Sequence, residues 1–159
     1  HQSFHLNRCC IGGTSAGAAV MSRHMIAQGP AVLRPSKEVV DTDIGLGLLS
    51  QAVVDQHFSE RRRLARLLST LAMRPDLLGV GIDEDTALVI ERGAAIEVIG
   101  QGTVTLILES LEQIEMLGVQ LHLLPSGHRY SVNSVGQTAR SAPLRRAIQR
   151  LVAAGPIRA

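Results

Sequence analysis

The feature that most constrains the fold of this chain is the pentapeptide Gly-Thr-Ser-Ala-Gly at residues 13–17. An apolar stretch, residues 8–11, comes before it, and residues 18–26 have the composition of a helix that ends near Gly29 and Pro30. A strand, a sharp turn and a helix in this order match the G-x-S-x-G nucleophile elbow, in which small residues flank a serine. We therefore expect a tight, strained turn where a strand meets a helix.

Ser15, at the centre of this turn, is a candidate nucleophile. Its hydroxyl is expected to project where a substrate carbonyl can reach it, and the N–H of Ala16 at the helix start is expected to stabilise an oxyanion. On the motif alone, a phosphate-binding glycine loop and a close strand–helix crossing stay open as alternatives. No lysine follows the glycines, as a P-loop would require.

Short apolar segments bounded by turn residues dominate the rest of the chain. They predict strands at residues 52–57, 77–82, 87–91, 95–99, 104–108 and 119–124. A hairpin-like turn at Arg92 and Gly93 joins two of them. Aromatic residues make up only 2% of the chain, so the core must consist of Leu, Val, Ile and Ala. Such a core suits an α/β fold with a mostly parallel sheet between layers of helices.

Two further helices are predicted. Ser59 can cap the first, which Pro75 closes, and residues 143–153 form a second, basic and amphipathic one. The apolar stripe of the first helix consists of Leu64, Leu67, Leu68 and Leu71. Because no internal repeat and no second domain are visible, we expect residues 1–159 to belong to a single domain.

His57 is the candidate base for Ser15. It ends a buried strand together with Asp55 and Gln56, and the carboxyl ends of strands in an open parallel sheet are where ligands gather. The serine and the histidine hold equivalent places on two such strands, so we expect their side chains to meet. A lone histidine is more often structural, but three polar residues in a row at a strand end favour a catalytic role.

Arginines cluster just after His57. Arg61, Arg62 and Arg63 follow Glu60, and Arg66 lies one turn further on. The start of a helix disfavours cations, and such violations of local preference are expected mainly where function requires them. An anionic ligand held by bidentate guanidinium groups would account for the cluster, and a solvated arginine face is the alternative.

A third polar element, Asp83-Glu84-Asp85, also ends a strand. A carboxylate there could orient the imidazole of His57 and stabilise its protonated form. A turn with a helix-capping aspartate is the alternative.

Together these segments resemble the cyanophycinase and aspartyl dipeptidase family of serine peptidases, and the cyanophycinases more than the dipeptidases. The matching stretches are residues 12–22, residues 55–59 with Arg61, Arg63 and Arg66, and residues 81–87. The resemblance covers residues 11–99 and extends more loosely to Tyr130.

The resemblance implies a three-layer, flavodoxin-like α/β fold related to class I glutamine amidotransferases, with a mostly parallel sheet. It implies that Ser15 attacks, that His57 is the base and that Glu84 is the orienting acid. The positions that match binding sites for a β-linked aspartyl-arginine unit are Asp55, Gln56, Arg61, Arg63 and Arg66. The expected reaction is hydrolysis of multi-arginyl-poly-aspartate to β-aspartyl-arginine dipeptides through an acyl-enzyme, with no cofactor and no metal.

Two departures from the family pattern shape these expectations. Cyanophycinases often carry an acidic residue in the loop after the elbow helix, but residues 28–34 contain none, which is why Glu84 is preferred. The family's earlier half is also absent, so residues 1–159 are expected to form an incomplete domain, with C-terminal strands and a basic tail helix in residues 100–159. A homodimer or a companion chain that supplies the missing half stays open, as does a binding module without turnover.

Composition limits the remaining classes. Cys9 and Cys10 are adjacent, which disfavours an ordinary disulfide between them, and neither belongs to a metal-ligand spacing. No apolar run approaches the length of a membrane span. We expect a cytoplasmic protein that binds neither nucleic acid nor membrane, and a signal peptide before His1 stays open. The chain order of serine, histidine and acid argues against an α/β-hydrolase esterase.

Overall fold

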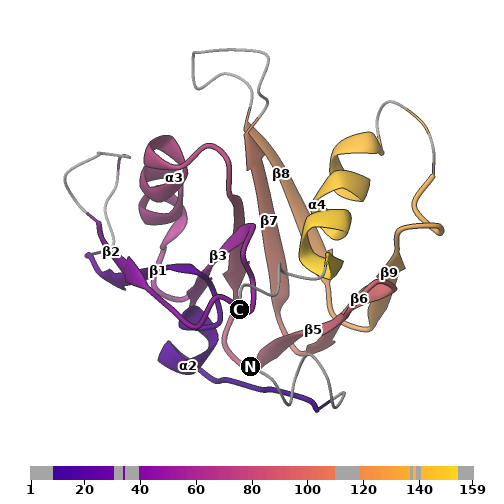
Figure 1. Ribbon diagram of the computed structural model, residues 1–159, viewed down its shortest axis with the longest axis horizontal. Coiled ribbons are helices and arrows are strands. Elements are labelled where there is room, and N and C mark those ends of the chain that lie inside the picture. Colours follow the sequence, from indigo (N-terminus) through magenta and orange to yellow (C-terminus); the bar gives the residue numbers. More distant parts are fainter. Residues whose placement is uncertain are drawn as a thin grey trace, which may run out of the picture.

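The structure, a computed structural model, describes residues 9–30, 34, 40–109, 119–136, 138 and 141–153. These residues form a mixed α/β arrangement (Figure 1). The elements in chain order are α2 (Ala16–Ala19), β1 (His24–Gln28), β2 (Asp41–Ile44), β3 (Ala52–Gln56), α3 (Leu64–Met73), β4 (Leu78–Ile82), β5 (Thr86–Glu91), β6 (Ala95–Gly100), β7 (Thr103–Glu109), β8 (Val119–Pro125), β9 (His128–Ser131) and α4 (Ala142–Val152).

The central sheet has the strand order β3-β4-β7-β8. β3 and β4 are parallel, with Ala52 opposite Leu78 and Gln56 opposite Ile82. β7 is antiparallel to β4, and β8 is antiparallel to β7. β3 and β4 can be parallel because α3 carries the chain back to the starting end of the sheet. The β5–β6 hairpin instead brings the chain back to the end of the sheet where β4 finishes, so β7 runs in the opposite direction. The described part of the sheet is therefore mixed, and it does not confirm the expected mostly parallel, flavodoxin-like sheet.

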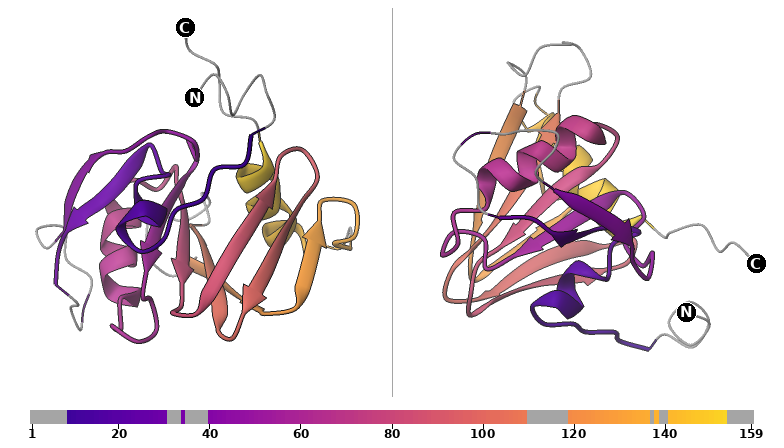
Figure 2. Two further views of the ribbon diagram at one scale, coloured as in Figure 1. Left: turned by 90° about the horizontal axis from the view of Figure 1, so that it is seen from below. Right: turned by 90° about the vertical axis from the view of Figure 1, so that its left-hand side faces the viewer.

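The second sheet has the order β5-β6-β9. The predicted hairpin is confirmed: Glu91 pairs with Ala95 across a turn in which Gly93 has a φ of 73°. β9 was not predicted. It follows β8 after a short turn in which Gly127 has a φ of 80°, a backbone conformation that favours glycine. Figure 2 shows this sheet on one side of the molecule and the β1–β2 ribbon on the other.

Two helices cover opposite faces of the central sheet (Figure 1). On one face, Leu67 and Leu71 of α3 pack in a cluster with Val53 of β3 and Ile107 of β7. The cluster on the other face joins α4 to strands of both sheets through Ala147, Ile148, Leu151, Leu106, Ile96 and Val98. Of the predicted stripe, Leu67 and Leu71 are thus fully buried, whereas Leu64 is exposed. The predicted cap at Ser59 is wrong, because the residue before the first turn of α3 is Arg63.

The predicted strand and helix around Ser15 are only partly right. Residues 9–14 form no strand, and the helix ends after Ala19 instead of continuing to residue 26. The reason is pairing with a distant segment: the carbonyls of Val20 and Met21 accept hydrogen bonds from Leu46 and Leu49. Tertiary hydrogen bonds thus override the helix propensity of this stretch. Residue 8 and, in the loop of residues 28–34, residues 31–33 lie outside the described residues.

Within the part of the chain that the structure describes, no helix combines the length and the apolar character needed to cross a membrane.

Candidate active site

The turn at Ser15 has the expected strained backbone. Ser15 has a φ of 50° and a ψ of −121°, which non-glycine residues rarely adopt. A Cβ placed on Gly13 would lie 2.2 Å from the carbonyl oxygen of Gly17, so this turn closes too tightly for a side chain there. Thr14 accepts a hydrogen bond from the Gly17 amide at 2.8 Å. The turn therefore holds the serine hydroxyl at the exposed start of α2.

The structure brings Ser15, His57 and Glu84 together. The Oγ of Ser15 lies 2.9 Å from Nε2 of His57, and Nδ1 of His57 lies 2.7 Å from Oε1 of Glu84. An ionised carboxylate only accepts hydrogen bonds, so Nδ1 carries the imidazole proton and Nε2 is left to accept from the serine hydroxyl. The side chains of His57 and Glu84 are 25% and 47% exposed. The relay thus opens to solvent at the surface of the described chain.

The parallel β3–β4 pair places the base and the acid side by side. Gln56 and Ile82 are the last partners in register, so the chain leaves both strands at the same edge of the sheet. The amide of Phe58 donates to the carbonyl of Ile82 at 3.1 Å and continues the pairing past the strand ends. His57 has a φ of 50°, which turns the chain sharply after β3. The carboxyl ends of β3 and β4 thus meet at one edge of the sheet, whereas the segment before Ser15, which was also predicted to be a strand, is not one.

Asp55 and Arg66 form a buried ion pair. The Nε of Arg66 donates to Oδ2 of Asp55 at 2.9 Å, and its Nη2 donates to Oδ1. Arg66 Nη1 also donates to the carbonyl of Gly29 at 2.7 Å. Asp55 is 1% exposed and Arg66 is 6% exposed. Asp55 and Arg66, both expected to bind substrate, thus form an ion pair with each other. Their contacts with substrate stay a prediction.

This pair gives a stability prediction for the whole gene product that contains the chain. Asp55→Ala is expected to lower the free energy of unfolding by about 3–5 kcal/mol, because it leaves the Arg66 guanidinium buried without its anion. Urea unfolding measures the change. The exposed pair of Arg74 and Asp76 supplies a control, since Asp76→Ala is expected to cost only about 0–1 kcal/mol. Equal costs for the two variants would show that the buried pair does not stabilise the fold.

Arg63 supports the residue before His57. Its Nη1 donates to the Oε1 of Gln56 at 3.0 Å and to the Gln56 carbonyl, and it lies 3.4 Å from Oδ1 of Asp55. Burial and the nearby charge of Arg66 lower the pKa of Arg63, and Asp55 opposes that shift. The guanidinium stays protonated at neutral pH because arginine starts from a very high pKa.

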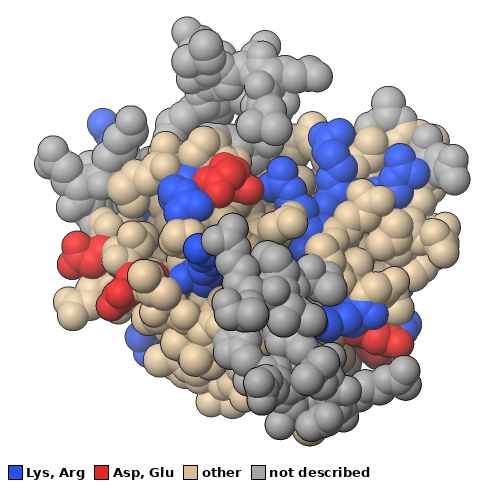
Figure 3. Space-filling model, viewed as in Figure 1, with Lys and Arg blue, Asp and Glu red and all other residues tan. Residues whose placement is uncertain are grey.

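Arg61 and Arg62 are exposed, and neither guanidinium has a hydrogen bond or an ion pair to another described residue. Figure 3 shows basic side chains at the surface on the face seen in Figure 1, both over α3 and beside α4. Of the predicted arginines, Arg61 is therefore the one whose charge is most available to a ligand.

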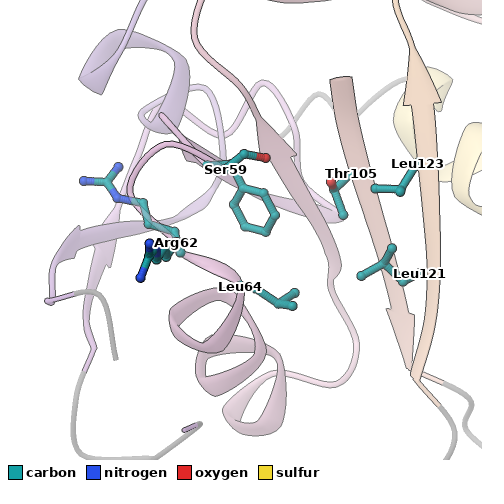
Figure 4. A pocket seen from close by; sticks show the side chains of 8 residues that line it. Ser59, Arg62, Leu64, Thr105, Leu121 and Leu123 are labelled. Atoms are coloured by element: carbon teal, nitrogen blue, oxygen red, sulfur yellow. The ribbon is translucent and has the colours of Figure 1, made fainter. Parts of the chain in front are cut away.

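A shallow hollow of about 290 Å³ lies between α3 and the β7–β8 hairpin (Figure 4). Its lining residues are Phe58, Ser59, Arg62, Arg63, Leu64, Thr105, Leu121 and Leu123. None of Ser15, His57 and Glu84 lines it, so the hollow is separate from the serine–histidine–glutamate relay. Among the described residues, no group of three or more His, Cys, Asp or Glu could hold a metal ion.

Sequence reasoning gave no role to two buried polar side chains. Ser22 lies outside the G-x-S-x-G pentapeptide. Its Oγ accepts a hydrogen bond from the amide of Val54 in β3 at 3.0 Å. Asp83 accepts hydrogen bonds from Ser59 and Thr103. An aspartate directly after a buried strand was the available signal for Asp83, whereas the only signal for Ser22 was its place at the end of the family-like stretch 12–22.

A serine on a strained turn, linked through a histidine to a carboxylate, defines the class: this is the arrangement of a serine hydrolase. The comparison with protein families agrees. A family described as "Peptidase family S51" matches residues 4–98. The chain belongs to peptidase family S51.

Curated relatives carry a more specific name. The chain is 43% identical to a cyanophycinase of Geminocystis herdmanii, over 82% of this chain and 52% of that protein. It is 42% identical to a cyanophycinase of Trichormus variabilis, over 76% of this chain and 44% of that protein. A cyanophycinase of Synechococcus elongatus is 40% identical, over 78% and 42% of the two chains. The chain thus spans about half the length of the curated relatives it matches.

Proposed function

We propose that this chain supplies the nucleophile, the base and the orienting acid of a serine peptidase that hydrolyses cyanophycin, multi-arginyl-poly-aspartate, to β-aspartyl-arginine dipeptides. The observation that carries the proposal is the relay from Ser15 through His57 to Glu84. The relay lies within a chain that is about 40% identical to proteins named cyanophycinase.

The geometry suits acyl transfer. Nε2 of His57 takes the hydroxyl proton while Oγ of Ser15 bonds to the substrate carbonyl carbon. The same proton then passes from Nε2 to the leaving amine as the peptide bond breaks and an acyl-enzyme forms. Water attacks the acyl-enzyme with His57 again as base, which frees the product acid and restores the serine. Throughout, Glu84 holds the imidazole in one tautomer and stabilises its positive form.

The proposed oxyanion donor is the amide of Ala16. The neighbouring amide of Gly17 is taken by Thr14, whereas the Ala16 amide has no backbone acceptor among the described residues. It starts α2 directly after the nucleophile, where an N–H can point at the oxygen of a tetrahedral intermediate.

For substrate choice we propose a division of labour within the polar cluster. Asp55, Gln56, Arg63 and Arg66 form one connected hydrogen-bonded unit beside the base. Gln56 and Arg63 are partly exposed and contact the β-linked aspartyl-arginine unit, and the buried Asp55–Arg66 pair acts on the substrate by holding them in place. Arg61 is exposed and its charge is uncommitted within the described chain, so its planar fork is available to a free carboxylate of the polymer. The arginine branches supply such carboxylates, because the aspartate side chains are already amide-linked to them.

This assignment gives a prediction for Arg61→Ala. The variant is expected to raise KM for cyanophycin about tenfold or more while KM for a neutral ester changes little, because one charge-assisted hydrogen bond contributes about 1.5–3 kcal/mol. Steady-state kinetics on both substrates measure it. Arg62→Ala is the matched control, since Arg62 is the adjacent exposed arginine. Equal losses on both substrates would indicate a structural role for the arginine cluster.

Product analysis tests the proposed reaction itself. The whole gene product is incubated with purified cyanophycin, and the released material is identified by mass spectrometry. The proposal predicts β-aspartyl-arginine dipeptide, which leaves the bond between the side chain of aspartate and arginine intact. Release of free arginine, or of nothing soluble, would contradict it.

We further propose that the parallel β3–β4 pair belongs to a larger, flavodoxin-like sheet in the active enzyme. Support comes from α3, which joins the two parallel strands, and from α4 on the opposite face. β3 ends the described strand order, and β4 is its only strand partner among the described residues. The further strands would come from polypeptide beyond this chain, a companion or a second copy, and a crystal structure of the whole gene product tests it.

A further inference from the structure

The carboxylate of Asp83 is the meeting point of two segments behind the relay. Its Oδ1 accepts from the amide of Ser59 at 3.1 Å. Its Oδ2 accepts from the amide of Thr103 at 3.0 Å and from the Thr103 hydroxyl at 2.6 Å. Asp83 is only 9% exposed. A nearly buried carboxylate thus has both oxygens committed to neutral donors.

These bonds join the backbones that carry the base and the acid. Ser59 lies two residues after His57, and Asp83 is the residue before Glu84. Thr103, the first residue of β7, completes the junction, and its carbonyl also accepts from the Asp83 amide at 3.3 Å. No hydrogen bond links the Asp83 carboxylate to the side chain of His57 or Glu84. Any influence of Asp83 on the relay therefore acts through the position of these two backbones.

Hydrogen bonds through Thr86 fix the backbone on the C-terminal side of Glu84. The hydroxyl of Thr86 donates to the Glu84 carbonyl at 2.8 Å and accepts from the amide of Gly102 at 2.9 Å. Gly102 itself is shaped to this junction, because a Cβ there would lie 2.8 Å from the Cβ of Asp83. Gly102, just before β7, and Thr103, its first residue, thus support the segment of the acid from two sides, through Thr86 and Asp83.

The charge of Asp83 is part of this geometry. Burial works against the ionised form, but hydrogen bonds from Ser59 and Thr103 more than offset it, so the pKa of Asp83 lies below its ordinary value. No arginine, lysine or histidine of the described chain forms an ion pair with it. An asparagine offers one acceptor oxygen where Asp83 uses two, so its NH₂ group would face the amide of either Ser59 or Thr103. The site therefore requires a carboxylate.

We propose that Asp83 is a positioning residue of the reaction: it fixes the turn that carries His57 against the segment that carries Glu84, so that their hydrogen bond forms. The inference rests on the proposed function, because it matters for turnover only if His57 and Glu84 act together. It predicts that small changes at Asp83 alter the rate of the chemical step more than the binding of substrate, since misplacement by about 1 Å can cost about 10²-fold.

The test uses the whole gene product and cyanophycin. Asp83→Asn is expected to lower kcat about 10–100-fold with KM changed less than about threefold, the size of loss typical when a group that supports a reactive residue is removed. Thr103→Val, which removes one donor, is expected to fall between this variant and the parent, and Thr103→Ser is expected to restore the parent rate. Asp85→Asn is the matched control: Asp85 is exposed, and its φ of 49° is one that asparagine tolerates.

Several outcomes decide the matter. A folded Asp83→Asn with the kcat of the parent, or a loss confined to KM, would overturn the proposal. If Asp83→Asn does not fold, the comparison of Thr103→Val with Thr103→Ser decides, and equal rates for these two would overturn it. Ser15→Ala, measured in parallel, distinguishes a failure of the proposed function from a failure of the role of Asp83: if Ser15→Ala keeps the parent rate, the proposed function is wrong whatever the Asp83 variants do.

Discussion

Ser15→Ala is expected to lower kcat of the whole gene product on cyanophycin by about 10⁶-fold, the size of loss seen when a serine nucleophile is removed from such a relay. The alanine leaves His57 without the hydroxyl that lies 2.9 Å from its Nε2. Release of β-aspartyl-arginine, followed by mass spectrometry, measures the rate.

Ser126→Ala is the control for this substitution, because the Ser126 hydroxyl donates to the Gly100 carbonyl and takes no part in the relay. It is expected to keep the parent rate. Activity of Ser15→Ala within about tenfold of the parent would mean that Ser15 is not the nucleophile.

Glu84→Gln is expected to lower kcat by about 10⁴-fold, with little change in the fold. The amide keeps the shape of the carboxylate but loses the charge that stabilises protonated His57. Its NH₂ group can also donate to Nδ1, which would place the imidazole proton on Nε2 and block acceptance from Ser15. Stopped-flow or steady-state kinetics on cyanophycin measure the loss.

The same substitution at another exposed acid supplies the control. Glu91 pairs with Arg129 on the β5–β6–β9 sheet, and Glu91→Gln is expected to leave kcat unchanged. If the two glutamine variants lose equally little, the carboxylate of the relay must come from elsewhere.

The meeting of Ser15 and His57 could be predicted from local sequence patterns, whereas Glu84 was singled out among the three acids of residues 83–85 by the family resemblance. Apolar runs that end in polar residues mark β3 and β4, and the pair has a common carboxyl edge once it is parallel. A glycine-flanked serine predicts its own strained turn, and Ser15 has that turn.

The segment around the elbow was predicted less well, because its structure depends on distant partners. Residues 18–26 have helical composition, but residues 20–23 exchange hydrogen bonds with residues 45–49, and β1 then pairs with β2. The direction of the strands could not be predicted from the sequence either. An apolar run such as residues 104–108 indicates burial, yet β7 is antiparallel to β4 because a hairpin precedes it.

The sequence shows a cluster of arginines but does not show which groups the arginines bind. The arginines near the start of α3 indicated an anionic ligand, and for Arg66 the structure supplies one from within the chain, Asp55. Sequence position also gave no reason to separate Asp83 from its neighbours. Its distinction is that Ser59 and Thr103, far apart in sequence, both donate to it.

The central claim is that this chain carries the reactive serine of a peptidase, and labelling with a fluorophosphonate probe tests it most directly. The whole gene product is exposed to the probe, and intact mass and peptide mapping locate the adduct. The account predicts a single adduct on Ser15, absent from Ser15→Ala and much slower to form in Glu84→Gln. No adduct, or an adduct on another residue, would contradict it and favour a binding module without turnover.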